Sequence, residues 1–145
     1  MTKLILSLVS AAAAANLKIG VVSDPHYNAF YQPYASGSNC MAADSGEVYA
    51  PIGRYECDAS PAMFDLMMTR FKDVFGEVDV LLVPGDHVAH QVSAKDDDPT
   101  GAEYEAVKQN LATTWAMFAH YFPNTMILPT VGNNDGRFHD EAIDE

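Results

Sequence analysis

Three short apolar runs alternate along this chain with two segments of helical periodicity. Residues 17–22, 78–83 and 125–131 are rich in aliphatic residues and are typical of strands. The first run is mostly apolar, as expected for a strand that is buried on both faces of a sheet. Strands that alternate with helices predict an α/β fold, with a parallel-rich sheet flanked by helices.

The two helical segments carry recognisable start and stop signals. Ser60 and Pro61 predict the start of the first helix, through a capping hydroxyl and a proline at the first helical position, and Gly76 predicts its end. The second helix is expected from about residue 103 to 121, with an apolar face that includes Val107 and Phe118. Pro123 follows it as a breaker.

Residues 27–60 lack helical periodicity and contain both cysteines, Cys40 and Cys57. A connection this long is uncommon in a compact domain and is often functional or crosslinked. In an exported chain an even cysteine count predicts a disulfide between the two. Two free thiols in a cytosolic protein, or two metal ligands, are the alternatives.

The N-terminus has the pattern of a secretory signal peptide. Lys3 precedes an apolar run at 4–9 and an alanine run at 11–15, so we expect residues 1–15 to be removed. An uncleaved helix packed on the domain is the alternative. Export would place the protein in a secreted, extracellular or lysosome-like compartment. No other segment is long enough to span a bilayer.

Charge narrows the expected partners. The formal net charge of −12 argues against a nucleic-acid partner, because tracking phosphates requires a basic face. The sequence carries no signal for an oligomeric state. A small-molecule or lipid substrate remains compatible with this charge.

Polar segments follow each apolar run: Asp24-Pro25-His26, Gly85-Asp86-His87 and Gly132-Asn133-Asn134-Asp135. In a parallel sheet the carboxyl ends of the strands meet at one edge, where ligands collect. Carboxylate, imidazole and amide groups at that edge can hold two cations. We expect Asp86 to bridge both metals.

The remaining ligands divide between the two cations. Asp24 and His26 stand two residues apart, so in an extended segment their side chains point the same way and can share one metal. Asn133 would supply an amide oxygen to the second metal. We expect zinc from this mixed set, with manganese or iron as alternatives.

These segments resemble the Asp-x-His, Gly-Asp and Gly-Asn motifs of the calcineurin-like metallophosphoesterases. The cysteine pair, the run from Cys57 to Pro61 and the Gly-Asp-x-x-x-His run ending at His90 are most similar to acid sphingomyelinase-like phosphodiesterases. The resemblance implies the N-terminal half of a metallophosphoesterase β-sandwich with helices on its faces. It also implies a later histidine and a Gly-His-x-His run, which residues up to Glu145 lack, so residues 16–145 are expected to form a partial domain.

One position departs from the pattern of this family. Relatives carry a histidine after the metal-binding asparagine, where it is thought to bind phosphate and protonate the leaving alkoxide, whereas this chain has Asn134. An amide can donate a hydrogen bond but cannot deliver a proton. His90 or His139 would then supply the proton, or the substrate has a good leaving group, or activity is low. Asn134 and His90 are the catalytic candidates.

The resemblance implies a secreted phosphodiesterase that uses metal-bound hydroxide. A phospholipid headgroup, a nucleotide or a polyphosphate would each fit as substrate. A non-catalytic relative that keeps the fold and binds a partner is one alternative, favoured by the missing later motifs and by Asn134. A generic phosphomonoesterase is another, which the cysteine pattern disfavours.

Overall fold

The computed structural model describes residues 16–42, 47–93 and 98–139. Its elements follow the predicted order, with a short 3-10 helix in the long connection. They are β1 (Ile19–Val21), η1 (Ser38–Cys40), α1 (Pro61–Phe75), β2 (Val80–Pro84), α2 (Ala102–Tyr121) and β3 (Met126–Thr130). The expected signal peptide lies outside the described residues.

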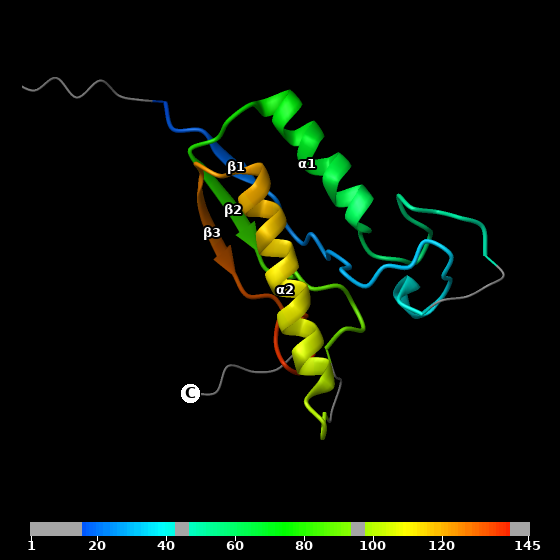
Figure 1. Ribbon diagram of the computed structural model, residues 1–145. Helices are drawn as coiled ribbons and strands as arrows, with labels where there is room; N and C mark the ends of the chain where they lie inside the picture. The colour runs from blue at the N-terminus through cyan, green and yellow to red at the C-terminus, as the bar shows by residue number, and fades with distance from the viewer. Residues whose placement is uncertain (1–15, 43–46, 94–97, 140–145) are drawn as a thin grey trace, which may run out of the picture.

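The three strands form one parallel sheet in the order β1-β2-β3 (Figure 1). Ile19 pairs with Val80, and Val80 pairs with Met126, so the strands run in step from their first residues. The predicted α/β fold with a parallel sheet is confirmed. The loops that follow the strands therefore start from the same edge.

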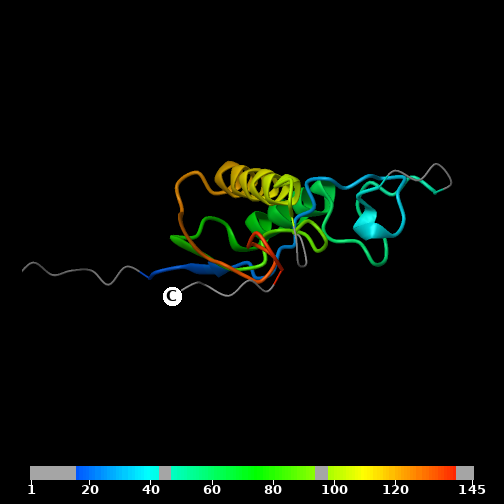
Figure 2. The same ribbon diagram turned by 90° about the horizontal axis from the view of Figure 1, so that it is seen from below.

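Both helices lie on one side of this sheet, as the view from below makes plain (Figure 2). The connections β1-α1-β2 and β2-α2-β3 advance in the same direction across the sheet, and crossovers of the same hand then place both helices on one face. Gly20 faces α1 at close range: a Cβ there would lie 2.7 Å from Cζ of Phe71. The glycine thus permits tight helix–sheet packing.

Among the described residues only one face of the first strand is covered, whereas its apolar sequence predicted burial on both faces. Ile19 and Val21 are 55% and 56% exposed, whereas Gly20 between them is buried. Side chains alternate between the faces of a strand, and among the described residues both helices cover the face of Gly20. The apolar run was misleading because its outward residues are as hydrophobic as a buried strand would require.

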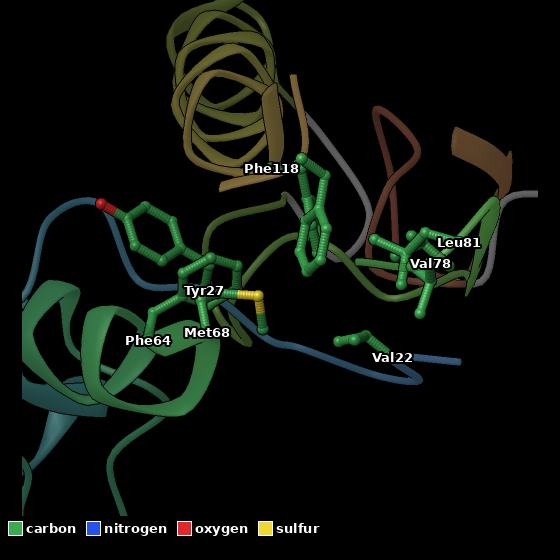
Figure 3. Close-up of a cluster of buried hydrophobic side chains, with 9 residues drawn as sticks. Val22, Tyr27, Phe64, Met68, Val78, Leu81 and Phe118 are labelled. Atoms are coloured by element: carbon green, nitrogen blue, oxygen red, sulfur yellow. The ribbon is translucent and has the colours of Figure 1, made fainter. Parts of the chain in front are cut away.

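The core fills the space between the helices and the strands (Figure 3). Phe64 of α1 meets Phe118 of α2 edge to face, with ring centroids 5.3 Å apart, and Tyr27 packs against Phe64 in the same way at 5.2 Å. Aromatic pairs favour this geometry beyond the area that they bury. The predicted apolar face of α2 is confirmed, since Val107 and Phe118 are fully buried.

The predicted helix signals act as expected. The Ser60 hydroxyl oxygen accepts a hydrogen bond from the Met63 N–H at 3.1 Å, which satisfies one of the free donors at the start of α1. Gly76 ends α1 with φ of 68°, a left-handed conformation that glycine adopts without steric cost. Neither described helix is long and apolar enough to cross a bilayer.

The long connection is crosslinked as predicted. Cys40 and Cys57 form a disulfide with their Cα atoms 5.7 Å apart. A crosslink over 17 positions stabilises the fold by about 3 kcal/mol in the chain-entropy description. The bond joins η1 to the segment that leads into α1, beside the residues discussed next.

Candidate metal centre and adjoining cleft

The loop after β1 runs between two other segments and is hydrogen-bonded to both. The backbone N–H of His26 donates to the Asp86 carbonyl at 3.0 Å, and the N–H of Tyr27 donates to the His87 carbonyl at 3.1 Å. On the other side, Tyr27 forms an isolated parallel bridge with Ala59. Burial raises the pKa of the Tyr27 phenol above its ordinary value, so this anchor stays neutral. Backbone pairing thus fixes where His26 stands.

Two glycines let the loops after β2 and β3 touch. A Cβ on Gly132 would lie 2.2 Å from both the backbone nitrogen and Oδ1 of Asp86, and a Cβ on Gly85 would lie 2.8 Å from the Gly132 Cα. No side chain fits at either place without moving backbone. The Asn134 N–H then donates to Asp86 Oδ1 at 3.0 Å. This contact is what holds the third segment against Asp86.

Asp24, His26 and Asp86 come together and form what we call the rim. Each offers a ligand atom within 4.8 Å of the others. His26 Nδ1 lies 3.3 Å from the Val88 carbonyl oxygen, which places the proton on Nδ1 and leaves the lone pair of Nε2 free. Nε2 is 3.6 Å from Asp86 Oδ2, close to the separation of about 3.3 Å for two tetrahedral ligands at 2.0–2.1 Å from one zinc ion. The rim therefore fits a divalent cation.

The backbone of the rim is held in an uncommon conformation. Asp24, His26 and Asp86 have φ values of 48°, 37° and 48°, all in the left-handed region that non-glycine residues rarely adopt. Such residues persist only where surrounding contacts over-determine them, and they cluster at functional sites. The strained backbone is thus a second indication, beside the sequence motifs, that these three residues belong to a functional site.

Asn133 and Asn134 differ in their exposure and in their contacts at the site. Asn133 is exposed, and its Nδ2 lies 2.9 Å from His139 Nε2. Asn134 is 1% exposed, and only its backbone N–H contacts Asp86. The structure brings both residues to the edge of the rim, and the assignment of Asn133 as ligand to a second metal stays a prediction.

His90 stacks on the rim. Its ring lies 4.2 Å from that of His26, with the planes 14° apart. His26, Asp58 and His90 also form a second group of potential metal ligands. Imidazole lone pairs lie in the ring plane, so two stacked rings cannot both direct a nitrogen at one cation in this arrangement. His90 is therefore a neighbour of the candidate ligands Asp24, His26 and Asp86.

Asp58 is a site residue that sequence reasoning missed. Both of its carboxylate oxygens lie 3.1 Å from His90 Nδ1, and Oδ2 also accepts the His90 N–H at 2.6 Å. Asn39 fixes Asp58 in turn, accepting its N–H at Oδ1 and donating to Oδ2, both at 2.6 Å. Asn39 and Asp58 each adjoin one cysteine of the disulfide. The position directly after Cys57 was the available signal.

A cleft of about 410 Å³ opens beside the rim. Its lining includes the two catalytic candidates, His90 and Asn134, together with His139. The rest of the lining is polar, consisting of Asn39, Glu56, Asp58, Gln91 and Ser93. Both histidines that could replace the missing proton donor thus face the same space as Asn134.

Behind the rim lies a second polar cluster, His87, Thr130 and Asp135, which we call the clamp. Asp135 Oδ1 accepts the N–H groups of His87 and Val88 at 2.8 and 2.9 Å, and Oδ2 accepts that of Gly132 at 2.9 Å. His87 Nε2 lies 2.8 Å from the Thr130 carbonyl oxygen. His87 is buried here, so it supports the loops and is neither a ligand nor a surface residue. The sequence assigned no role to Asp135.

Comparisons with known proteins agree with the motifs. Sphingomyelin phosphodiesterase A of Dictyostelium discoideum is 27% identical over 128 residues, covering 84% of this chain and 20% of the relative. Endopolyphosphatase of Schizosaccharomyces pombe is 28% identical over 134 residues, covering 79% and 22%. Sphingomyelin phosphodiesterase 2 of Caenorhabditis elegans is 26% identical over 93 residues, covering 61% and 14%.

The resemblance to metallophosphoesterases is thereby confirmed: by name, two of these relatives are phosphodiesterases and one is a polyphosphatase. The chain spans only about a fifth of the length of the first two relatives it matches. No family model matches it.

Proposed function

We propose that the protein containing this chain is a metal-dependent phosphoester hydrolase, and specifically a phosphodiesterase of the acid sphingomyelinase-like kind. The observation that carries the proposal is the convergence of Asp24, His26 and Asp86 at the carboxyl edge of a parallel sheet. Two relatives named sphingomyelin phosphodiesterase support the finer assignment. The disulfide supports an exported protein, because such bonds persist in oxidising compartments.

The chemistry of the site needs two divalent cations, and we expect zinc. When bound, they would activate water at neutral pH and neutralise charge on the phosphoryl oxygens. Asp24 and His26 would hold one cation, Asn133 the other, and Asp86 both. The hydrogen bond from His26 to the Val88 carbonyl fixes the tautomer that such binding requires.

The residues beside the metal site would protonate the leaving group and form hydrogen bonds with the substrate. Water adds to phosphorus, the bond from phosphorus to the alcohol oxygen breaks, and the alcohol oxygen takes up a proton. We assign this proton to Nε2 of His90, because Asp58 occupies its Nδ1 side and holds the ring against His26. Asn134 contributes hydrogen bonding only.

The test is hydrolysis of two phosphodiesters by the zinc-loaded natural protein: bis(4-nitrophenyl) phosphate and a dialkyl phosphate ester. We expect turnover of the aryl ester that a chelator abolishes and zinc restores. His90→Gln should lower alkyl-ester turnover by about 10²-fold more than aryl-ester turnover, since nitrophenolate leaves without a proton. His120→Gln, on the exposed side of α2, is the matched control. Absence of any metal-dependent turnover would favour the non-catalytic alternative.

A further inference from the structure

Asn39 is a buried residue whose side chain joins two segments that are distant in the sequence. It is 4% exposed. Its Oδ1 accepts the Asp58 N–H at 2.6 Å, and its Nδ2 donates to Asp58 Oδ2 at 2.6 Å and to the His90 carbonyl oxygen at 2.8 Å. The reverse orientation of the amide would set its nitrogen against an N–H and its oxygen against a carboxylate. The contacts therefore allow this side chain one orientation.

The backbone that carries Asn39 is held in an uncommon conformation. The three residues of η1 have φ values of 42°, 53° and 58°, in the left-handed region. Successive non-glycine residues rarely adopt this region and stay there only where surrounding contacts fix them. Two such contacts are the hydrogen bond from buried Asn28 Nδ2 to the Asn39 carbonyl oxygen, at 2.8 Å, and the disulfide between Cys40 and Cys57. Because the cysteines adjoin Asn39 and Asp58, the disulfide keeps these two side chains opposite each other.

The ring of His90 depends on this arrangement. Its side chain is 53% exposed, and apart from stacking on His26 it is held by the two oxygens of Asp58, each 3.1 Å from Nδ1. An exposed imidazole can turn about its side-chain bonds unless a partner fixes it. Asp58 can fix the ring only while its own carboxylate stays in place, and Asn39 holds that carboxylate.

We propose that Asn39 is the positioning residue of the proton donor: it orients Asp58, and through Asp58 the ring of His90, and the disulfide serves the reaction by holding Asn39. The inference rests on the proposed function for the role of His90. It deepens that function by giving the crosslink a purpose in the reaction besides stability. The contacts that carry it do not involve the metal ligands Asp24 and Asp86.

The experiment replaces Asn39 by glycine in the zinc-loaded natural protein. Glycine adopts the φ of 53° without steric cost, so Asn39→Gly removes the side chain and leaves the backbone of η1 in place. We expect kcat for the dialkyl phosphate ester to fall about tenfold, because a misplaced ring no longer delivers its proton to the leaving oxygen. The kcat for bis(4-nitrophenyl) phosphate should change by less than about twofold, since nitrophenolate leaves without a proton.

A conservative variant and a control accompany this measurement. Asn39→Asp keeps the acceptor for the Asp58 N–H and tolerates the left-handed backbone, but it loses the donor and sets a second carboxylate against Asp58. It should show the same selective loss with the alkyl ester. Asn124→Gly, at an exposed position after α2, should leave both esters unaffected. Equal loss with both esters would show a merely structural role for Asn39 and, like the absence of any loss, would overturn the inference.

A spectroscopic readout separates this inference from the proposed function. Asp58 beside Nδ1 places the proton of the neutral His90 ring on Nδ1, and the NMR shifts of the ring nitrogens report this tautomer. In Asn39→Gly, and in the double variant Cys40→Ala/Cys57→Ala, we expect these shifts to move toward a mixture of the two tautomers. Unchanged ring shifts in either folded variant would contradict the inference. Failure to hydrolyse bis(4-nitrophenyl) phosphate would instead overturn the proposed function, and the ring shifts would still decide whether Asn39 positions His90.

Discussion

Two aspartates follow the adjacent strands β2 and β3, and their surroundings differ. Asp135, in the clamp, accepts three backbone N–H groups, and its side chain is 3% exposed. Asp86, in the rim, accepts one backbone N–H, and its side chain is 15% exposed. A carboxylate has about four acceptor sites, so Asp135 is nearly saturated while Asp86 keeps lone pairs for a cation. Hydrogen-bond occupancy thus separates Asp135, a scaffold carboxylate, from Asp86, the candidate ligand.

The comparison also shows how the two clusters depend on each other. The clamp joins the loop after β2 to the loop after β3, and Gly132, one of its donors, lies against Asp86. The rim in turn holds strained backbone at Asp86. Rigid hydrogen bonding behind a site is what permits strained ligands in front of it.

The largest expected effect is the loss of metal from the rim. Asp86→Ala should abolish binding of both cations, because no single water replaces a carboxylate shared by two metals. Isothermal titration with zinc compares the variant with the natural protein. Asp86→Asn is a second variant for the same measurement, because asparagine tolerates the φ of 48° at this position. Asp73→Ala, an exposed carboxylate of α1, is the control. Retention of either site at its original affinity would exclude Asp86 as the bridge.

Asp135→Ala tests the clamp, and its main effect should be a loss of stability. Three N–H groups, those of His87 and Val88 buried and that of Gly132 partly buried, would lose their acceptor, and we expect the free energy of unfolding to fall by about 3 kcal/mol or more. Urea unfolding monitored by Trp115 fluorescence measures it. Asp73→Ala should change the same quantity by less than about 0.5 kcal/mol. A similarly small change for Asp135→Ala would show that the clamp is dispensable.

Much of the fold was predictable because its signals are local. Ser60 and Gly76 bound a helix through groups that act within one turn, and the strand ends follow from the apolar runs. The convergence of the rim residues was predictable for a topological reason: parallel strands deliver their carboxyl ends to one edge of the sheet. Asp24, His26 and Asp86 needed no more information than that.

What could not be predicted depends on contacts between distant segments. Asp58 pairs with His90 across 32 positions, and Asp135 reaches His87 across 48. Asp58 follows Cys57 and Asp135 ends the third polar segment, but neither position in the sequence shows which distant group the carboxylate contacts. The exposure of Ile19 was missed for a similar reason, because it depends on which face the helices cover.

Gly132→Ala should affect both clusters together. Its Cβ would lie 2.2 Å from Asp86 Oδ1, so the loops must separate, and overpacking of this kind typically costs about 1–3 kcal/mol. We expect a lower unfolding midpoint and weaker zinc binding in the same variant. Gly53→Ala is the matched control, since a Cβ there meets only Met63 Cε at an ordinary 3.7 Å. A change in stability alone would show that the rim does not need the contact between the loops.

Asp24→Asn should produce the smallest effect of these variants. It tests which of the two cations Asp24 binds. Asp24 is exposed and makes its described side-chain hydrogen bond only with the neighbouring Ser23, so stability should change by less than about 0.5 kcal/mol. Asparagine keeps the shape of the side chain and tolerates φ of 48°, and only the charge is removed. Zinc titration should then show one weakened site and one of unchanged affinity, because Asp24 serves only the cation that it shares with His26. Equal weakening of both sites would mean that Asp24, and not Asp86 alone, contributes to both cations.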